Sequence, residues 1–212
     1  MKKKMTQKLF DLSNKTIILT GSAGRLGSNF AEILADAGAN LVLIDINEKE
    51  NKKLEKRITK KFKIKCISSN ANITIKKELL ELAKIIIEKF GKIDGLVNNA
   101  FYNPRTNVEQ SARKFEDYSL DLWNDVVSVN LTGVFLCSQT FGKIMAKQKE
   151  GGSIVNISSI YGINGADQRI YGDSKLNSPP SYAATKGAVV NFTKYLAAFW
   201  NRKNIRVNTM TL

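Results

Sequence analysis

The sequence contains no histidine, only two cysteines and only three prolines. Without histidine the chain lacks the commonest general base and the commonest metal ligand of enzymes, so we expect no metal site. Cys66 and Cys137 lie far apart and do not make a disulfide framework. Reduced thiols are therefore expected, which favours a cytoplasmic location.

Long apolar runs are also absent. No run approaches the roughly 18 residues that a membrane span needs, and the basic start "MKKKMTQKLF" has no apolar core of a secretory signal after it. We expect no association with a membrane. The 212 residues, 43% of them hydrophobic, are enough for one full core, and no internal linker or repeat is visible. Residues 1–212 are therefore predicted to form a single domain.

Acidic residues are few compared with basic ones. The chain has 33 lysines and arginines against 19 aspartates and glutamates, a formal net charge of +14. Much of the excess lies in "NEKENKKLEKRITKKFKIK" at 47–65, which we interpret as the solvated face of a surface helix. A general attraction for anionic ligands, such as phosphorylated cofactors, is the alternative. Specific nucleic-acid binding is not favoured, because no aromatic interleaving accompanies the charge.

Apolar runs rich in β-branched residues alternate with amphipathic stretches along the chain. The expected strands are 15–21, 40–46, 63–71, 92–100, 152–159 and 205–210, and the expected helices are 25–38, the lysine-rich stretch, 76–91, 120–148 and 181–203. Such alternation predicts a three-layer, doubly wound parallel α/β sheet of the Rossmann type in the order 3-2-1-4-5-6. The connections at 101–119 and 160–181 are long enough to suggest a function.

The stretch "TGSAGRLG" (20–27) links the first expected strand to the first helix. Gly21 permits a tight turn, Gly27 permits a close approach, and the N-terminus of the helix offers free N–H groups to a pyrophosphate. Asp45 ends the second strand, where an acid can accept hydrogen bonds from ribose hydroxyls and repel a 2′-phosphate. Arg25 argues the other way, because a guanidinium can pair with that phosphate. NAD is favoured over NADP.

Several motifs in this order resemble the short-chain dehydrogenase/reductase family. "TGSAGRLG" resembles the TGxxxGxG loop of that family, and "NNA" (98–100) resembles its NNAG. Asn130 in "VNLTG", the "NISS" that ends at Ser159, and "YAATK" (182–186) resemble its catalytic asparagine, serine and YxxxK. The resemblance covers 15–212 and implies an oxidoreductase that moves a hydride between NAD or NADP and a secondary alcohol or ketone.

The resemblance also implies a role for each matching residue. Tyr182 would be the acid/base that exchanges a proton with the substrate oxygen. Lys186, one helical turn further on, would bind the nicotinamide ribose and favour the ionised phenol of Tyr182. Ser159 would hydrogen-bond the reacting oxygen, and Asn130 would hold a water in the proton relay. Ser158 competes with Ser159, but the family places the catalytic serine second in this doublet.

The cofactor site and the quaternary structure follow from the same resemblance. A homodimer or homotetramer is expected through the helices at 120–148 and 181–203. The residues implied in cofactor binding are Gly21, Ser22, Arg25, Leu26, Gly27, Asp45, Asn72, Ile73, Asn99, Ala100, Tyr182 and Lys186. For Asn72, an ordinary polar residue at a strand end is an equal alternative.

A second tyrosine–lysine pair, Tyr171 and Lys175, precedes the first. Its distance from Ser159 is closer to the family's usual gap, but "GDSKLNSPP" follows Tyr171, and this is turn chemistry ended by two prolines. Tyr182 is followed by a helical pattern, with Ser181 as the expected N-cap. We therefore assign the catalysis to Tyr182 and Lys186.

The extra residues between Ser159 and Tyr182 are interpreted as an insertion that covers the substrate. Arg169, Tyr171 and Lys175 are its candidate substrate residues, suited to a polar or anionic ligand such as a sugar or sugar phosphate. A surface loop with incidental polar residues is the alternative. "SSIYG" followed by such an insertion resembles bacterial enzymes that synthesise surface sugars or flagellin glycans.

Three features depart from the family pattern. Arg25 replaces the middle glycine of the loop, with Gly24 one position early, and Phe101 replaces the glycine after "NNA". The usual seventh strand and the substrate-covering segment are expected to be absent from this chain. These departures keep open a non-catalytic NAD(P)-binding protein of the same fold. A basic nucleic-acid binder is the weaker alternative.

Overall fold

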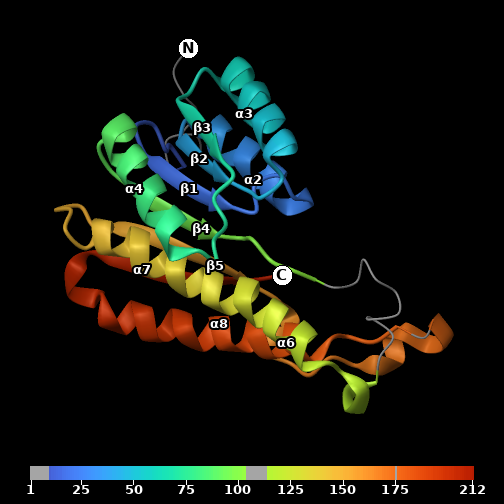
Figure 1. Cartoon of the computed structure of the whole chain (residues 1–212). Coiled ribbons are helices and arrows are strands. Elements are labelled where there is room, and N and C mark those ends of the chain that lie inside the picture. Colours follow the sequence, from blue (N-terminus) through green and yellow to red (C-terminus); the bar gives the residue numbers. More distant parts are fainter. Residues whose placement is uncertain (1–9, 104–113, 175) are drawn as a thin grey trace.

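The computed structural model describes residues 10–103, 114–174 and 176–212. Within these residues the chain forms a six-stranded sheet in which all neighbouring strands are parallel, in the order β3-β2-β1-β4-β5-β6 (Figure 1). The strands are β1 Thr16–Thr20, β2 Asn40–Ile44, β3 Cys66–Ser69, β4 Gly95–Asn98, β5 Gly152–Ser158 and β6 Ile205–Thr211. This order confirms the predicted one. It places the reversal of strand order between β1 and β4, where doubly wound sheets bind ligands.

Helices cover both faces of the sheet, which gives three layers (Figure 1). They are α2 Arg25–Asp36, α3 Glu48–Phe62, α4 Lys76–Phe90, α6 Leu120–Val127, α7 Val134–Met145 and α8 Pro180–Phe199. Alternate residues of β1 serve the two layers: Ile17 and Leu19 pack with α2 and α3, whereas Ile18 belongs to the core with α4, α7 and α8. No helix of the described chain is both long and apolar enough to cross a membrane.

The lysine-rich stretch forms α3, as expected. Leu54 and Ile58 are buried, and the lysines and arginines of the helix are exposed to solvent. Arg57 and Lys61 of α3 both pair with Glu32 of α2, each at 3.0 Å. The excess positive charge therefore includes the solvated face of a surface helix.

The single helix predicted at 120–148 is wrong in detail. The chain forms α6, then wider π-helical turns at Ser128–Gly133, and then α7. At Gly133 the chain passes so close to the segment after β3 that a Cβ would lie 2.6 Å from Ile73 Cδ1. Single π-helical turns inside longer helices are frequent at functional sites. Periodicity of apolar residues does not distinguish them from a continuous α-helix.

The N-cap predicted for the last long helix is also wrong. α8 is capped by Pro179 and has Pro180 as its first residue, a position at which a missing N–H costs no hydrogen bond. Ser181 lies inside the first turn and is fully buried. Its hydroxyl hydrogen-bonds the Tyr118 hydroxyl at 2.7 Å, which ties the start of α8 to the segment before α6.

The described residues of the inserted connection between β5 and α8 form 3₁₀ turns at Ile160–Gly162 and Gln168–Ser174. The second is kinked at Gly172, whose φ is 47°. Gln168 closes the insertion by accepting a hydrogen bond from Ser178 N at 2.9 Å. In Figure 1 this orange segment lies at the end of the molecule where α6 begins.

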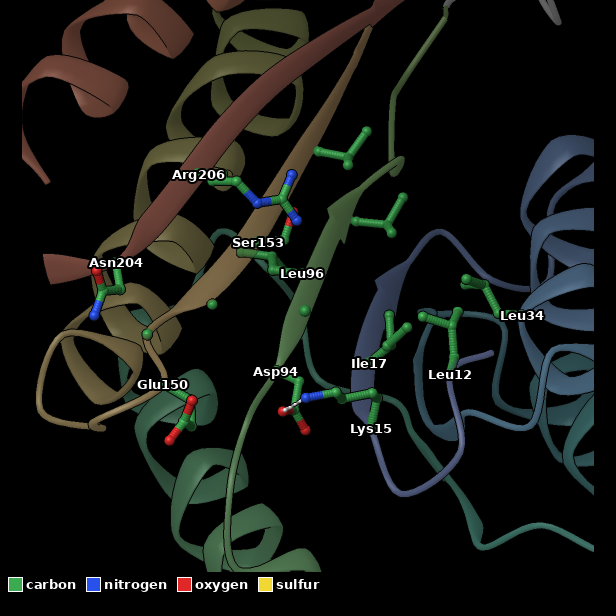
Figure 2. Close-up of a pocket in the computed structure, with 15 residues that line it drawn as sticks. Leu12, Lys15, Ile17, Leu34, Asp94, Leu96, Glu150, Ser153, Asn204 and Arg206 are labelled. Carbon is green, nitrogen blue, oxygen red and sulfur yellow. Dashed lines mark hydrogen bonds and ion pairs between the residues drawn. The ribbon is translucent and has the colours of Figure 1, made fainter. Parts of the chain in front are cut away.

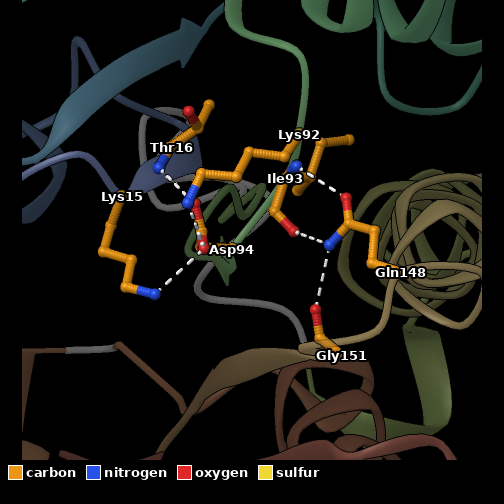
Figure 3. Close-up of polar contacts among 7 residues, drawn as sticks. All are labelled: Lys15, Thr16, Lys92, Ile93, Asp94, Gln148 and Gly151. Carbon is orange, nitrogen blue, oxygen red and sulfur yellow. Dashed lines mark hydrogen bonds and ion pairs between the residues drawn. The ribbon is translucent and has the colours of Figure 1, made fainter.

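A cavity of about 360 Å³ lies at the amino ends of the strands (Figure 2). Apolar residues such as Ile17 and Leu34 and charged residues such as Lys15 and Arg206 line it. Beside it, Asp94 accepts hydrogen bonds from Thr16 N and from Lys15 Nζ (Figure 3). These contacts fix the amino end of β1 against β4, at the edge opposite the predicted site.

Gln148 joins the turn after α7 to the segment before β4 (Figure 3). Its Oε1 accepts from Ile93 N at 2.9 Å, and its Nε2 donates to Ile93 O at 2.8 Å and to Gly151 O at 3.0 Å. The three backbone groups depend on this one side chain.

Gln148→Ala is expected to lower the free energy of unfolding by about 1–2 kcal/mol, because these partly buried backbone groups lose their partner. Urea denaturation followed by circular dichroism measures the change. The matched control is the exposed neighbour in Lys147→Ala, which should change stability by less than about 0.5 kcal/mol. Equal stability of the two variants would contradict the role given to Gln148.

Candidate active site

The loop between β1 and α2 is shaped by two glycines. Gly21 has φ +65°, and a Cβ on it would lie 2.6 Å from Ala100 Cα. A Cβ on Gly27 would lie 2.0 Å from Gly21 O, so only glycine lets α2 pack against the loop. α2 begins at Arg25 directly after Gly24, and no acidic residue occupies its first turn. Its N-terminal N–H groups can therefore receive an anion, as predicted.

The end of β4 is locked onto this loop by Thr20. Thr20 Oγ1 accepts hydrogen bonds from Asn99 N and Ala100 N, both at 3.0 Å. In return, Asn99 Nδ2 donates to Thr20 O and Gly21 O, also at 3.0 Å. The "NNA" stretch and the glycine loop thus form one rigid unit at the reversal of strand order.

Two cavities open at this unit. The first, the loop cavity, has a volume of about 580 Å³ and is lined by the glycine loop and the end of β4. The second, the strand-end cavity, has a volume of about 360 Å³ and extends past β2 and β3 to the π-helical turns. Asp45 lines both cavities. The predicted cofactor residues on these walls are Gly21, Arg25, Leu26, Gly27, Asp45, Asn72, Ile73, Asn99 and Ala100.

Asp45 also holds the glycine loop through a hydrogen bond to the loop backbone. Its Oδ2 accepts from Ala23 N and its Oδ1 from Asn47 N, both at 2.9 Å. Each carboxylate oxygen has a further lone pair for a hydroxyl in the cavity. An aspartate here therefore fits the ribose-binding role predicted for it.

Ser22 differs from the other predicted cofactor residues because its side chain points inward. The residue is fully buried, and its hydroxyl donates to Asn51 Oδ1 at 2.8 Å. Asn51 in turn donates to the carbonyl groups of Leu43 and Ser69. Ser22 therefore anchors the loop to β2 and β3, and it lines neither cavity within the described residues.

Asn72 lies on the wall of the strand-end cavity. Its Oδ1 accepts from Thr74 N at 3.0 Å and from the Thr74 hydroxyl at 2.8 Å, and its backbone N–H donates to Glu78. This is a capped turn before α4, which agrees with the structural alternative given above. Its place on the cavity wall agrees with the ligand-binding role, and the two are compatible.

Tyr182 and Lys186 occupy successive turns of α8, as expected. Lys186 is only 5% exposed, and its Nζ donates to Ile157 O at 2.8 Å. Burial lowers the pKa of Lys186 from 10.5 to about 8. The Lys186 carbonyl group also accepts from the Ser158 hydroxyl at 2.9 Å. The lysine thus holds α8 against the carboxyl end of β5 through two hydrogen bonds.

The two serines at the end of β5 have different environments. The Ser158 hydroxyl donates to the backbone of α8, as just described. The Ser159 hydroxyl accepts a hydrogen bond from Tyr161 N at 3.3 Å and so keeps its own proton to donate. This difference supports Ser159 as the residue that faces the substrate.

Asn130 lies in the π-helical turns and is buried. Its Oδ1 accepts from Tyr102 N at 2.7 Å, and its Nδ2 donates to Tyr102 O at 3.1 Å. The side chain therefore clamps the chain just after "NNA". One lone pair and one N–H of the amide are left for a water molecule.

The described candidate substrate residues of the insertion lie in the 3₁₀ turns before α8, the helix that carries Tyr182 and Lys186. Arg169 is 92% exposed and forms an ion pair with Asp167 at 2.7 Å. Tyr171 lies in the kinked 3₁₀ turns, so it has no helix to place a lysine on the same face. Lys175 lies outside the described residues. The structure agrees with Tyr182 and Lys186 as the helical pair.

Two residues of the site were not assigned a role from the sequence. The Phe101 ring lies 5.6 Å from Lys186 Nζ and meets the Tyr182 ring edge-on, with 6.5 Å between centroids. The sequence shows that Phe101 replaces the family's glycine after "NNA". It does not show where the ring lies. For Tyr118, which binds the buried Ser181, the sequence held no signal.

Fold and site together define an α/β oxidoreductase of the dinucleotide-binding class. The short chain dehydrogenase family model matches residues 15–212. The chain is 33% identical over 202 residues to 2-dehydro-3-deoxy-D-gluconate 5-dehydrogenase of Dickeya dadantii (strain 3937), covering 95% of this chain and 72% of that protein. It is 32% identical over 200 residues to 5-keto-D-gluconate 5-reductase of Escherichia coli (strain K12), covering 94% and 71%. The protein belongs to the short-chain dehydrogenase/reductase family.

A solved structure of NAD⁺-bound xylitol dehydrogenase superimposes with a TM-score of 0.82 and 28% identity, covering 94% of this chain and 70% of that one. The chain thus spans between two thirds and three quarters of the length of these proteins. The predicted family, fold and oxidoreductase class are confirmed. Among the described residues, no group of three or more histidine, cysteine or acidic side chains could hold a metal ion.

The burial of Lys186 predicts a conflict between stability and activity. Lowering its pKa from 10.5 to about 8 corresponds to a cost of about 3 kcal/mol for the charged folded state. Lys186→Met removes this cost and loses the hydrogen bond to Ile157 O, worth about 1–2 kcal/mol. The variant should therefore unfold with a free energy about 1 kcal/mol higher at pH 7.

The free energy of unfolding depends on pH because the folded and unfolded states bind different numbers of protons at Lys186. Between pH 8 and 10.5 the unfolded wild type holds a proton at Lys186 that the folded state has released. The wild type therefore gains stability relative to Lys186→Met as the pH rises through this range. Urea denaturation at pH 7 and pH 10 measures the difference. A difference that does not change with pH would contradict the buried ammonium.

Proposed function

We propose that the protein transfers a hydride between NAD(P) and a secondary alcohol or ketone of a sugar-like substrate, with Tyr182 as the acid/base. The observation that carries the proposal is the placing of Tyr182 and buried Lys186 on one face of α8. There Lys186 Nζ binds the end of β5, next to Ser159. The two cavities suited to a dinucleotide open at the neighbouring strand ends.

The residues of the glycine loop fit a dinucleotide. Gly21 and Gly27 let the loop pack closely against Ala100 and against the start of α2, and the N-terminus of α2 offers N–H groups to a ligand's phosphates. Asp45 would bind ribose hydroxyls, and Asn72 with Ile73 would border the adenine. When bound, the nicotinamide ring would supply or accept the hydride.

The proton chemistry belongs to the chain's own residues. Ser159, with its proton free to donate, would hold the substrate oxygen beside the Tyr182 hydroxyl. Tyr182 would donate a proton to that oxygen in reduction and accept it in oxidation. The ammonium of Lys186 would stabilise the phenolate and bind the nicotinamide ribose. Asn130 would hold the loop after "NNA" and bind a relay water with its remaining hydrogen-bonding groups.

The substrate class rests on relatives and on the insertion. Two relatives are named for sugar acids, and a structural neighbour is named for xylitol. The guanidinium of Arg169, with Tyr171 and Lys175, would bind hydroxyl or anionic groups of such a ligand. The structure's exposed Arg169 is compatible with this role, since it can turn toward a ligand.

The preference for NAD over NADP rests on Asp45. A carboxylate on the walls of both cavities repels a 2′-phosphate, whereas Arg25, the first residue of α2, lines the loop cavity and not the strand-end cavity. The energy gained from an Arg25–phosphate pair would have to exceed this repulsion. A cytoplasmic location, expected from two cysteines that form no disulfide, stays a prediction.

A homo-oligomer is proposed from an aromatic strip along α7 and α8, formed by Phe135, Phe192, Tyr195 and Phe199. Successive rings lie 5.9 to 6.4 Å apart between centroids. Tyr195 and Phe199 are 60% and 64% exposed. Contiguous exposed aromatic surface is typical of an interface between proteins. The helices involved are those predicted to carry the contact.

Tyr182→Phe is expected to lower turnover by at least about 100-fold, because the proton donor is removed. Cofactor affinity should change little. The matched control is Tyr171→Phe. Its turnover should stay within about threefold of the wild type, because Tyr171 is proposed to contact the substrate and not to transfer the proton. Turnover is measured with xylitol and 5-keto-D-gluconate among a panel of polyols and sugar acids, with NAD(H) and NADP(H).

Survival of activity in Tyr182→Phe, with its loss in Tyr171→Phe, would contradict the assignment. Saturable cofactor binding without turnover on any member of the panel would instead support a non-catalytic nucleotide-binding protein. The same titrations compare NADH with NADPH. A lower Kd for NADPH would contradict the role of Asp45.

Tyr195→Glu is expected to dissociate the oligomer, because it places charge in the middle of the aromatic strip. Size-exclusion chromatography with light scattering measures the mass. The control is Lys194→Glu, a charge change at the neighbouring exposed position. Equal mass for the Tyr195 variant and the wild type would contradict this interface.

A further inference from the structure

Phe101 occupies the point where the cofactor cavities meet the catalytic residues. It lines both the loop cavity and the strand-end cavity. Its ring also lies 5.6 Å from Lys186 Nζ and 6.5 Å from the centroid of the Tyr182 ring. Over the described chain, the walls of the two cavities include neither Tyr182 nor Lys186. The ring therefore stands between the space for the cofactor and the residues it must reach.

The backbone around Phe101 is held on both sides. Before it, Ala100 N donates to Thr20 Oγ1 at 3.0 Å. After it, both backbone groups of Tyr102 are bound by the Asn130 side chain. The Phe101 side chain itself is 49% exposed. Rotation of this side chain can therefore move the ring into solvent without moving the backbone.

We propose that Phe101 is a gating residue: its ring lies against Lys186 and Tyr182 and must rotate away before the nicotinamide end of a dinucleotide can reach them. The inference rests on the proposed function, since it concerns access to the same site. The family's glycine at this position would leave the way open. Phe101 thus makes cofactor binding depend on a change in the conformation of its side chain.

The contacts of the ring explain why the closed position is favoured. An ammonium near an aromatic face is attracted by the ring's quadrupole, and the attraction is stronger where water is excluded, as at buried Lys186. The edge-on contact with Tyr182 adds to it. A ligand that must displace the ring binds with an affinity reduced by the fraction of molecules that are open.

The opposite role would be a stacking platform, in which the ring packs on the bound nicotinamide or its ribose. The two roles predict opposite signs when the ring is removed. A gate predicts tighter cofactor binding, and a platform predicts weaker binding. A purely structural ring predicts no change in affinity.

The test is Phe101→Ala, with Phe115→Ala as the control because Phe115 is also exposed but lies outside both cavities. NADH binding without substrate is measured by fluorescence titration and stopped flow. We expect Phe101→Ala to lower Kd about tenfold, equivalent to about 1.4 kcal/mol, mainly through faster association. The control should match the wild type.

A second measurement follows the gate without any cofactor. Lys186 is modified with an amine-reactive reagent at pH 8, and its labelling is compared by mass spectrometry with that of Lys194, an exposed lysine on the same helix. We expect Phe101→Ala to label Lys186 several times faster than the wild type. A merely structural ring would leave the ratio to Lys194 unchanged.

The outcomes separate the gate from the function it serves. Unchanged or weaker NADH binding in Phe101→Ala, beside a wild type that binds and turns over substrate, overturns the gate alone. An unchanged Lys186 labelling ratio overturns it as well. If neither the wild type nor Phe101→Ala binds NADH or NADPH, the proposed function and the gate both fall.

Discussion

The buried ammonium of Lys186 ties the helix that carries Tyr182 to the strand end that carries Ser159. Its Nζ binds Ile157 O, and its own carbonyl group receives the Ser158 hydroxyl. Gly162 allows this approach, because a Cβ there would lie 2.7 Å from Lys186 O. One residue therefore docks α8 on β5 and, in the proposed function, supplies the positive charge of the reaction centre. Burying that charge costs stability, so function and folding oppose each other at this point.

The cofactor half of the site depends on a different kind of contact. Thr20 and Asn99 exchange hydrogen bonds across the gap between β1 and β4, and these fix the glycine loop relative to the "NNA" stretch. All of these groups are neutral and buried or partly buried, so their geometry is insensitive to pH. The glycine loop is thus held by hydrogen bonds between neutral groups. The residues around Tyr182 are held by a hydrogen bond from the Lys186 ammonium. Phe101 lies between these two parts of the site: it lines both cavities and its ring is close to Lys186 and Tyr182.

The sequence predicts the strands, their order and the placing of Tyr182 and Lys186 on one helix because each depends on local patterns. A run such as "TIILT" is typical of a strand buried on both faces, as in a parallel sheet covered by helices, and two prolines exclude Tyr171 from a long helix. Features that depend on tertiary partners are not predictable in this way. Ser181 was expected to cap α8 but is instead buried against Tyr118. The π-helical turns at Ser128–Gly133 are a second such feature. The spacing of apolar residues in the sequence does not distinguish them from a continuous α-helix.

The proposed function assigns chemistry and specificity to different parts of this fold. The proposed acid/base, lysine and serine come from the packed ends of β5 and α8, whereas the candidate substrate residues come from the inserted segment. Arg169 pairs with Asp167 in solvent, and an exposed ion pair is worth only about 0–1 kcal/mol. The guanidinium can therefore exchange Asp167 for a carboxylate or phosphate of a ligand at little cost, and a bidentate pair in a less exposed place is stronger. Changes in the insertion can alter the substrate without disturbing the proton-transfer residues.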